Sequence, residues 1–173
     1  MIFIVSDASS IILLEKTRLL DKIINEFIMM IPKEIEMEAI IFGKERNYPD
    51  AFRIEEKIKK NLIKVKNVKN QKFVRKLMED FNIGKGEAEA IALFKQESAN
   101  LLATDDKLAI KACRSLLIPT SGTCAFVTQS FDNKIISKDE ANDMIEILAK
   151  EGRYKGDIIF KALNHIKGGK NEK

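Results

Sequence analysis

Five acidic side chains are the residues of this chain best suited to chemistry, because carboxylates can bind a hard metal ion. Each stands where an apolar run gives way to polar residues, or on a short acidic helix: Asp7, Glu38, Glu87, Asp105 and Asp106. Carboxylates that gather at one edge of a sheet form an all-oxygen site, which Mg²⁺ or Mn²⁺ prefers. A metal pair held in this way can hydrolyse a phosphodiester with water. Metal-dependent phosphodiester hydrolysis is therefore our first hypothesis.

The same acids also have structural interpretations. Aspartate is a favoured N-cap, so Asp7, and either Asp105 or Asp106, could cap the helices that follow them. Glu87 opens a helix, where the helix dipole favours an acid. Glu38 lies among other glutamates, which are more often solvated. A cap explains one residue at a time, whereas a metal site explains the set, and we favour the metal site.

Other catalytic classes lack their residues. His165 is the single histidine, which disfavours a histidine-dependent triad. Cys113 and Cys124 form no CxxC pattern, so a zinc site is not expected. A phosphatase with an aspartate nucleophile would need a second aspartate shortly after Asp7, where this chain has Ser9. No P-loop, GxGxxG or GxSxG motif is present in the sequence.

Short apolar runs alternate with segments of helical periodicity, which indicates βαβ units and a parallel sheet. We expect strands at 1–5, 28–31, 100–104 and 118–122, and a strand or an extended segment at 62–68. We expect helices at 11–27, 33–42, 51–60, 72–81, 87–95, 105–117, 123–130, 138–150 and 156–166, and a loop at 43–50. The predicted fold class is α/β, a three-layer α/β/α sandwich around a mostly parallel sheet of four or five strands. Its functional crevice should lie off the carboxyl ends of the strands, where Asp7, Asp105 and Asp106 fall.

The composition fits one domain in a reducing compartment. The chain has 173 residues, a net charge of +4 and two cysteines.

Nine Lys and Arg residues and no acid lie between positions 57 and 76, so the rest of the chain is net acidic. This basic stretch suits phosphate attraction beside a metal site and equally suits a solvated helical face. No signal peptide or membrane-spanning run is visible, so we expect a cytoplasmic protein without a membrane partner.

The order and spacing of these motifs resemble the PIN-domain ribonucleases, a family that includes the VapC toxins and archaeal RNA-processing nucleases. Five segments carry the resemblance: Asp7–Ile12, Pro32–Glu38, Gly86–Leu93, Thr104–Asp106 and Ser121–Thr123. In the third segment, Glu87 takes the place where many VapC proteins have aspartate. In the fourth, Asp106 takes the usual acidic position and Asp105 is its neighbour. The resemblance covers residues 1–130, the expected nuclease domain, followed by a helical extension at 131–166 packed on it and a polar tail at 167–173.

The resemblance implies a divalent-metal-dependent endoribonuclease. The implied catalytic acids are Asp7, Glu38, Glu87 and Asp106, and the implied ligands of Mg²⁺ or Mn²⁺ are Asp7, Glu87, Asp105 and Asp106. Substrate contacts are expected from Ser9, Lys85, Thr104 and Thr123. The expected partners are RNA, preferably single-stranded, an antitoxin protein if the chain is a toxin of a toxin–antitoxin pair, and a second copy in a homodimer. An RNA-processing enzyme, a DNA-directed nuclease and a catalytically inactive RNA-binding or scaffold module remain open as alternatives.

Overall fold

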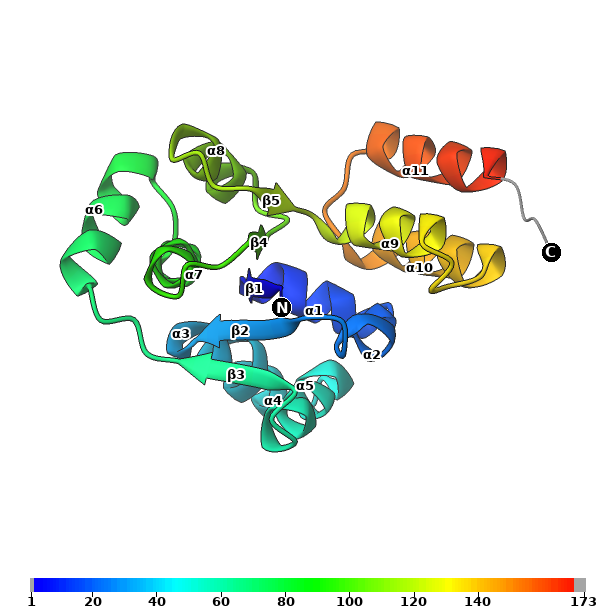
Figure 1. Ribbon diagram of the computed structural model, residues 1–173. Coiled ribbons are helices and arrows are strands. Elements are labelled where there is room, and N and C mark those ends of the chain that lie inside the picture. Colours follow the sequence, from blue (N-terminus) through cyan, green and yellow to red (C-terminus); the bar gives the residue numbers. More distant parts are fainter. Residues whose placement is uncertain (1, 170–173) are drawn as a thin grey trace.

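A five-stranded parallel sheet forms the centre of the computed structural model, which describes residues 2–169 (Figure 1). The strand order is β3-β2-β1-β4-β5, and every neighbouring pair is parallel. The strands are β1 (Phe3–Ser6), β2 (Ile28–Pro32), β3 (Ile63–Lys66), β4 (Leu101–Ala103) and β5 (Thr120–Ser121). The predicted three-layer α/β/α sandwich is therefore confirmed, with five strands in the sheet.

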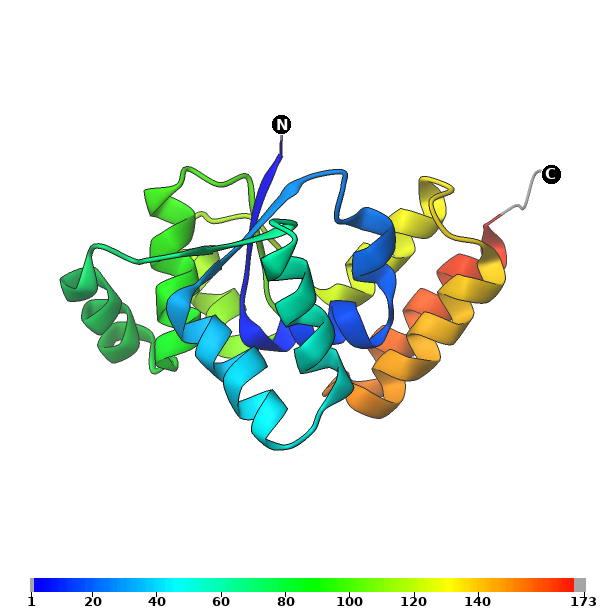
Figure 2. The ribbon, with the colours of Figure 1, turned by 90° about the horizontal axis from the view of Figure 1, so that it is seen from below.

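The helices cover both faces of this sheet (Figure 2). Their bounds are α1 (Ala8–Lys16), α2 (Leu19–Ile23), α3 (Lys33–Glu36), the π-helical segment η1 (Met37–Ile41), α4 (Phe42–Glu45), α5 (Pro49–Lys59), α6 (Gln71–Phe81), α7 (Lys85–Gln96), α8 (Lys107–Ser115), α9 (Thr123–Asp132), α10 (Lys138–Glu151) and α11 (Gly156–Gly168). None of the helices in residues 2–169 combines the length and the apolar character that a membrane crossing requires.

Two hydrophobic cores lie between the sheet and its helices, one on each face of the sheet. Successive residues of a strand point to opposite faces, so they contribute to different cores. In β1, Ile4 belongs to one core and Val5 to the other. In β2, Met29 and Ile31 enter the first core, and Met30 enters the second. The first core contains side chains of α1, α5, α9, α10 and α11, and the second contains those of α6, α7 and α8. The three inner strands β1, β2 and β4 are mostly buried on both faces, which explains why they are mainly apolar runs, whereas the edge strands β3 and β5 carry polar side chains.

The sequence predicts one helix over 11–27, but the structure has two helices, α1 and α2, in this region. The region begins at Ala8, where Asp7 caps it, and breaks between α1 and α2 at Arg18, whose φ is 62°. The hydroxyl of Thr17 donates to the carbonyl oxygen of Leu13 at 2.9 Å, so the chain turns just after α1. The predicted loop at 43–50 is also partly helical, because α4 extends to Glu45 and α5 begins at Pro49.

A buried ionic network joins α1, α2 and α5. The side chain of Glu15 is fully buried, with Nε of Arg53 at 2.7 Å from Oε1 and Nζ of Lys57 at 2.8 Å from Oε2. Nζ of Lys57 also lies 2.7 Å from Oδ1 of Asp21. Burial of a carboxylate is costly unless cations compensate it, so this network fixes α5 against α1.

The last three helices, α9, α10 and α11, pack together at one end of the molecule (Figure 2). Helix α9 runs through the predicted domain boundary at residue 130, and its apolar side chains share one core with those of α10 and α11. The division into a domain at 1–130 and an extension at 131–166 stays a prediction. Helix α11 continues to Gly168, two residues into the predicted tail, and positions 170–173 of that tail lie outside the described residues.

Candidate functional site

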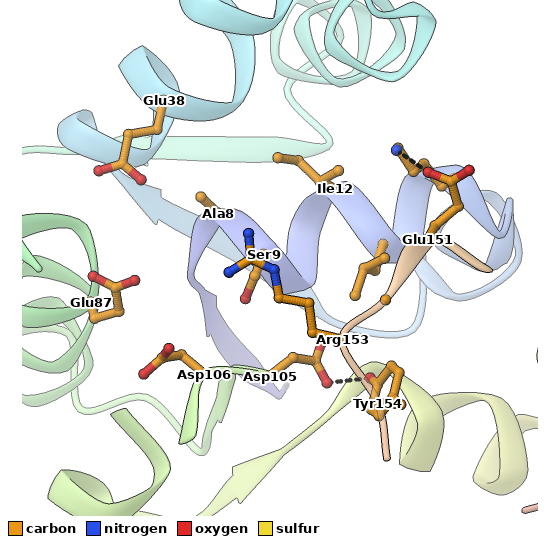
Figure 3. Close-up of a pocket in the computed structure, with 13 residues that line it drawn as sticks. Ala8, Ser9, Ile12, Glu38, Glu87, Asp105, Asp106, Glu151, Arg153 and Tyr154 are labelled. Carbon is orange, nitrogen blue, oxygen red and sulfur yellow. Dashed lines mark hydrogen bonds and ion pairs between the residues drawn. The ribbon is translucent and has the colours of Figure 1, made fainter. Parts of the chain in front are cut away.

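Four of the five predicted acids line one cleft at the carboxyl edge of the sheet (Figure 3). The cleft has a volume of about 470 Å³, and its acidic lining includes Glu38 from η1, Glu87 from α7, and Asp105 and Asp106 from the loop after β4. Glu38, Glu87 and Asp106 point towards one another across the cleft in Figure 3. Acids that are far apart in sequence therefore converge, as expected for residues that follow parallel strands.

The fifth acid, Asp7, lies beneath this cleft at the end of β1, with only 2% of its surface exposed. Its Oδ1 accepts hydrogen bonds from the backbone N–H of Ser10 at 2.8 Å and the hydroxyl of Ser9 at 3.0 Å. The bond from Ser10 makes Asp7 the N-cap of α1. The structural interpretation of Asp7 is thus confirmed, and the capping bond fixes the direction of its carboxylate.

Thr104 links two of the acids. Its hydroxyl donates to Oδ2 of Asp7 at 2.5 Å and accepts a hydrogen bond from the backbone N–H of Asp106 at 3.2 Å. Asp106 also caps α8, because its Oδ1 accepts from the backbone N–H of Ala109 at 2.8 Å. Thr104 is fully buried, so its hydroxyl positions the two acids, and burial disfavours the predicted contact of Thr104 with substrate.

Asp105 is held by donors from distant parts of the chain. Its carboxylate accepts from the backbone N–H of Thr123 at 2.9 Å and the hydroxyl of Thr123 at 2.6 Å. The hydroxyl of Tyr154 donates to Oδ1 of Asp105 as well. Thr123 is fully buried, and its Oγ1 also lies 3.3 Å from the hydroxyl of Ser10. Both oxygens of Asp105 therefore accept hydrogen bonds, and the buried Thr123 helps to fix the direction of this carboxylate.

Two glycines make room for the glutamates. A Cβ atom at Gly86 would lie 2.7 Å from Oε1 of Glu38 and 2.9 Å from Cδ1 of Ile35. A Cβ atom at Gly84 would lie 2.6 Å from Oε2 of Glu87. All three distances are shorter than a normal contact, so each glutamate occupies the space that a side chain at the neighbouring glycine position would need. Glu38 also stands on the π-helical segment, a distortion that is frequent at functional sites.

Burial and mutual repulsion raise the pKa values of two acids. Burial is the main reason why the pKa of Asp7 rises from its usual 3.8 to about 7, although hydrogen bonds from Thr104 and from residues of α1 oppose it. Burial, followed by the charges of Glu87 and Glu34, raises the pKa of Glu38 to about 6. The site therefore concentrates negative charge beyond what its own cations compensate, and a bound cation would relieve this repulsion.

The donor set fits Mg²⁺ or Mn²⁺ in kind, since every available ligand atom is an oxygen. Within residues 2–169, however, no three acidic, histidine or cysteine side chains lie close enough together to hold a metal ion as they stand. Glu38, Glu87 and Asp106 project into the open cleft, so rotation of their side chains is required to bring them to one ion.

Two further predicted substrate contacts differ in position. Ser9 lines the cleft, although its hydroxyl donates to Asp7. Lys85 is not among the cleft-lining residues, and its Nζ donates to Oε2 of Glu34 at 2.5 Å. The basic stretch 57–76 is divided among α5, β3 and α6, and several of its lysines pair with acids such as Glu56 and Glu97.

Three residues near the C-terminus enter the site without a prediction from the sequence. Glu151, Arg153 and Tyr154 line the cleft beside the acids. Glu151 ends α10, Arg153 and Tyr154 follow it, and none of the three belongs to the motifs along the first 130 residues. The two cysteines take no part, because both are buried and burial raises the pKa of each thiol to about 11.

Comparison with known families gives one match. The family model DUF3368, described as a PIN domain, matches residues 3–167, which includes the C-terminal helices up to α11. No curated protein and no solved structure matches the chain. The match agrees with the resemblance that the acidic motifs indicate.

Proposed function

The chain belongs to the PIN-domain family, whose members are generally nucleases, and from this premise we propose that it is a divalent-metal-dependent endoribonuclease. One observation carries the proposal: Glu38, Glu87, Asp105 and Asp106, from three separate segments, line a single cleft together with Ala8 and Ser9, the two residues that follow Asp7. An N-cap role explains Asp7 and Asp106 individually, but it does not explain why the other acids face the same space.

The proposed ligands of Mg²⁺ or Mn²⁺ are Asp7, Glu87 and Asp106. Asp105 lines the cleft and is a candidate for a fourth ligand, with Thr123 and Tyr154 holding its carboxylate as Ser9, Ser10 and Thr104 hold that of Asp7. When bound, such a cation supplies a Lewis acid for the scissile phosphate and activates a water nucleophile. No nucleophilic side chain is needed for this chemistry.

Glu38 is proposed as the proton-transfer group. Its carboxylate faces the cleft, and its pKa of about 6 lies close to neutral pH. A carboxylate with such a pKa can accept a proton from an attacking water or return one to a leaving oxygen. Glu87, which faces it across the cleft, contributes to that pKa by charge repulsion, so the two glutamates differ in their proposed roles.

The proposed substrate is single-stranded RNA, and this choice is supported by the membership of the chain in the PIN-domain family. A toxin that pairs with an antitoxin, an RNA-processing enzyme and a homodimer are all compatible with the site. The competing proposal is a catalytically inactive RNA-binding or scaffold module. The separation of the carboxylates favours it, because no three of them form a metal-binding group within the part of the chain that the structure describes.

Cleavage of a 5′-labelled single-stranded RNA in Mn²⁺ or Mg²⁺ tests the proposal. We expect cutting that disappears with EDTA and in Asp7→Asn and Glu87→Gln, but persists in Asp80→Asn. Asp80 is an exposed residue of α6 and is absent from the cleft, so it controls for the loss of one negative charge. A folded protein that cuts neither RNA nor single-stranded DNA would favour the inactive module. Cutting of DNA alone would make it a DNA-directed nuclease.

A further inference from the structure

Residues 151–154, which lead from the end of α10 towards α11, line the acidic cleft and are anchored at both ends. Oε2 of Glu151 pairs with Nζ of Lys16 on α1 at 2.6 Å. The hydroxyl of Tyr154 donates to Asp105 and accepts from the backbone N–H of Cys124 at 3.2 Å. These contacts connect the segment to α1, α9 and the loop after β4, so its path across the cleft is defined by specific bonds.

Gly152 allows this path. A Cβ atom at this position would lie 2.7 Å from the carbonyl oxygen of Leu148 and 2.7 Å from Cδ2 of Tyr154. The absence of a side chain therefore lets the ring of Tyr154 fold back against the end of α10. This close approach brings the hydroxyl of Tyr154 to Asp105 and leaves Arg153 between two anchored residues.

Arg153 is directed into the cleft. Figure 3 shows its side chain extending from the segment towards Ser9. The cleft is lined by two cationic residues, Lys16 and Arg153. Lys16 is neutralised by Glu151, whereas Arg153 forms no ion pair with any acid in residues 2–169. An exposed guanidinium that faces an acidic cleft without a protein partner has its hydrogen-bond donors available for a ligand.

We propose that Arg153 binds a phosphate of the nucleic acid substrate beside the acidic site, so that the C-terminal helical hairpin contributes to substrate binding. The proposal rests on the function proposed above. A cleft lined by carboxylates repels the phosphate backbone, and a cation at its mouth counters this repulsion. The planar guanidinium can donate two parallel hydrogen bonds to one phosphate, which a lysine ammonium cannot reproduce.

Binding of a labelled single-stranded RNA, measured by fluorescence anisotropy in EDTA at several salt concentrations, tests this role without cleavage. Arg153→Ala should raise Kd roughly tenfold or more, as expected for the loss of a charge-assisted hydrogen bond. It should also reduce the slope of log K against log salt by about 0.7, the value for one phosphate contact on a single strand. Arg153→Lys should restore only part of the affinity.

Lys155→Ala is the matched control, because Lys155 is exposed, lies two positions away and is absent from the cleft lining. It removes the same charge, and we expect its Kd to change less than threefold. Equal effects of Arg153→Ala and Lys155→Ala would overturn the inference, and so would a wild-type protein that does not bind RNA. Thermal melting of each variant checks that it is folded.

The cleavage assay separates this inference from the proposed function. If the wild type cleaves RNA and Arg153→Ala cleaves it with the same KM and kcat, the inference fails while the function stands. If the wild type binds RNA through Arg153 but cuts nothing, the inference stands and the catalytic proposal fails. If both proposals hold, Arg153→Ala should raise KM more than it lowers kcat.

Discussion

Replacement of Asp7 by asparagine should stabilise the metal-free protein at alkaline pH. Asp7 is almost fully buried, and burial raises its pKa from 3.8 to about 7. One pKa unit corresponds to about 1.4 kcal/mol, so ionised Asp7 costs the folded state on the order of 4 kcal/mol above pH 7. Asparagine has no charge to bury and is an equally good N-cap, since its side-chain oxygen can still accept from Ser10.

The expected gain is smaller than this cost, because the amide NH2 group that replaces Oδ2 cannot accept the hydrogen bond that Thr104 donates to the carboxylate. We expect a gain of ~1–3 kcal/mol, which raises the Tm of a domain of this size by roughly 3–10 °C. Thermal unfolding in EDTA at pH 8 measures it, with Asp80→Asn as the control.

The pH dependence has a definite sign. Between pH 3.8 and about 7 the folded state binds a proton at Asp7 that the unfolded state has lost. Stability contributed by this group therefore falls as pH rises through that window. The advantage of Asp7→Asn should accordingly be small near pH 5 and large at pH 8, and Mn²⁺ should raise the Tm of the wild type more than that of the variant. A Tm at pH 8 that is lower in Asp7→Asn than in the wild type would refute the reasoning.

Three other substitutions test separate parts of the structure. Gly86→Ala places a Cβ atom 2.7 Å from Oε1 of Glu38, so cleavage should fall at least tenfold; unchanged kcat would show that this carboxylate has room to move. Lys57→Met leaves the buried Glu15 with one fewer cation, and urea unfolding should show a loss of about 3 kcal/mol; a loss below 1 kcal/mol would contradict the buried network. Tyr154→Phe removes a hydroxyl that is bonded to Asp105 and to the backbone of Cys124, both contacts being partly buried, and should cost roughly 1 kcal/mol by the same measurement; an unchanged free energy of unfolding would contradict these contacts.

The inner strands of the sheet were predictable from the sequence because they are mostly buried on both faces. Runs such as Ile28–Pro32 contain no polar alternation, and helical segments separate them. The break between α1 and α2 was not predictable in the same way. Apolar periodicity continues through it, and the left-handed conformation of Arg18 leaves no mark in that periodicity.

The acids of the site were predictable because they follow strands or open helices. The placement of Asp7 and Asp106 as helix caps was predictable for the same reason. The presence of Arg153 and Tyr154 in the cleft was not predictable, because it depends on how α10 and α11 pack against α9. Local sequence around these two residues carries no motif that relates them to Asp105, which is bonded to Tyr154 across 49 positions.

An anomalous difference map from a crystal soaked in MnCl₂ at pH 8 would test the central claim most directly, because Mn²⁺ can then be located independently of activity. The account predicts a peak in the cleft within ligand distance of Asp7, Glu87 and Asp106, with the side chains of Glu87 and Asp106 rotated from the positions described above. Ordered carboxylates with no peak in the cleft, or a peak confined to surface acids outside it, would contradict the account.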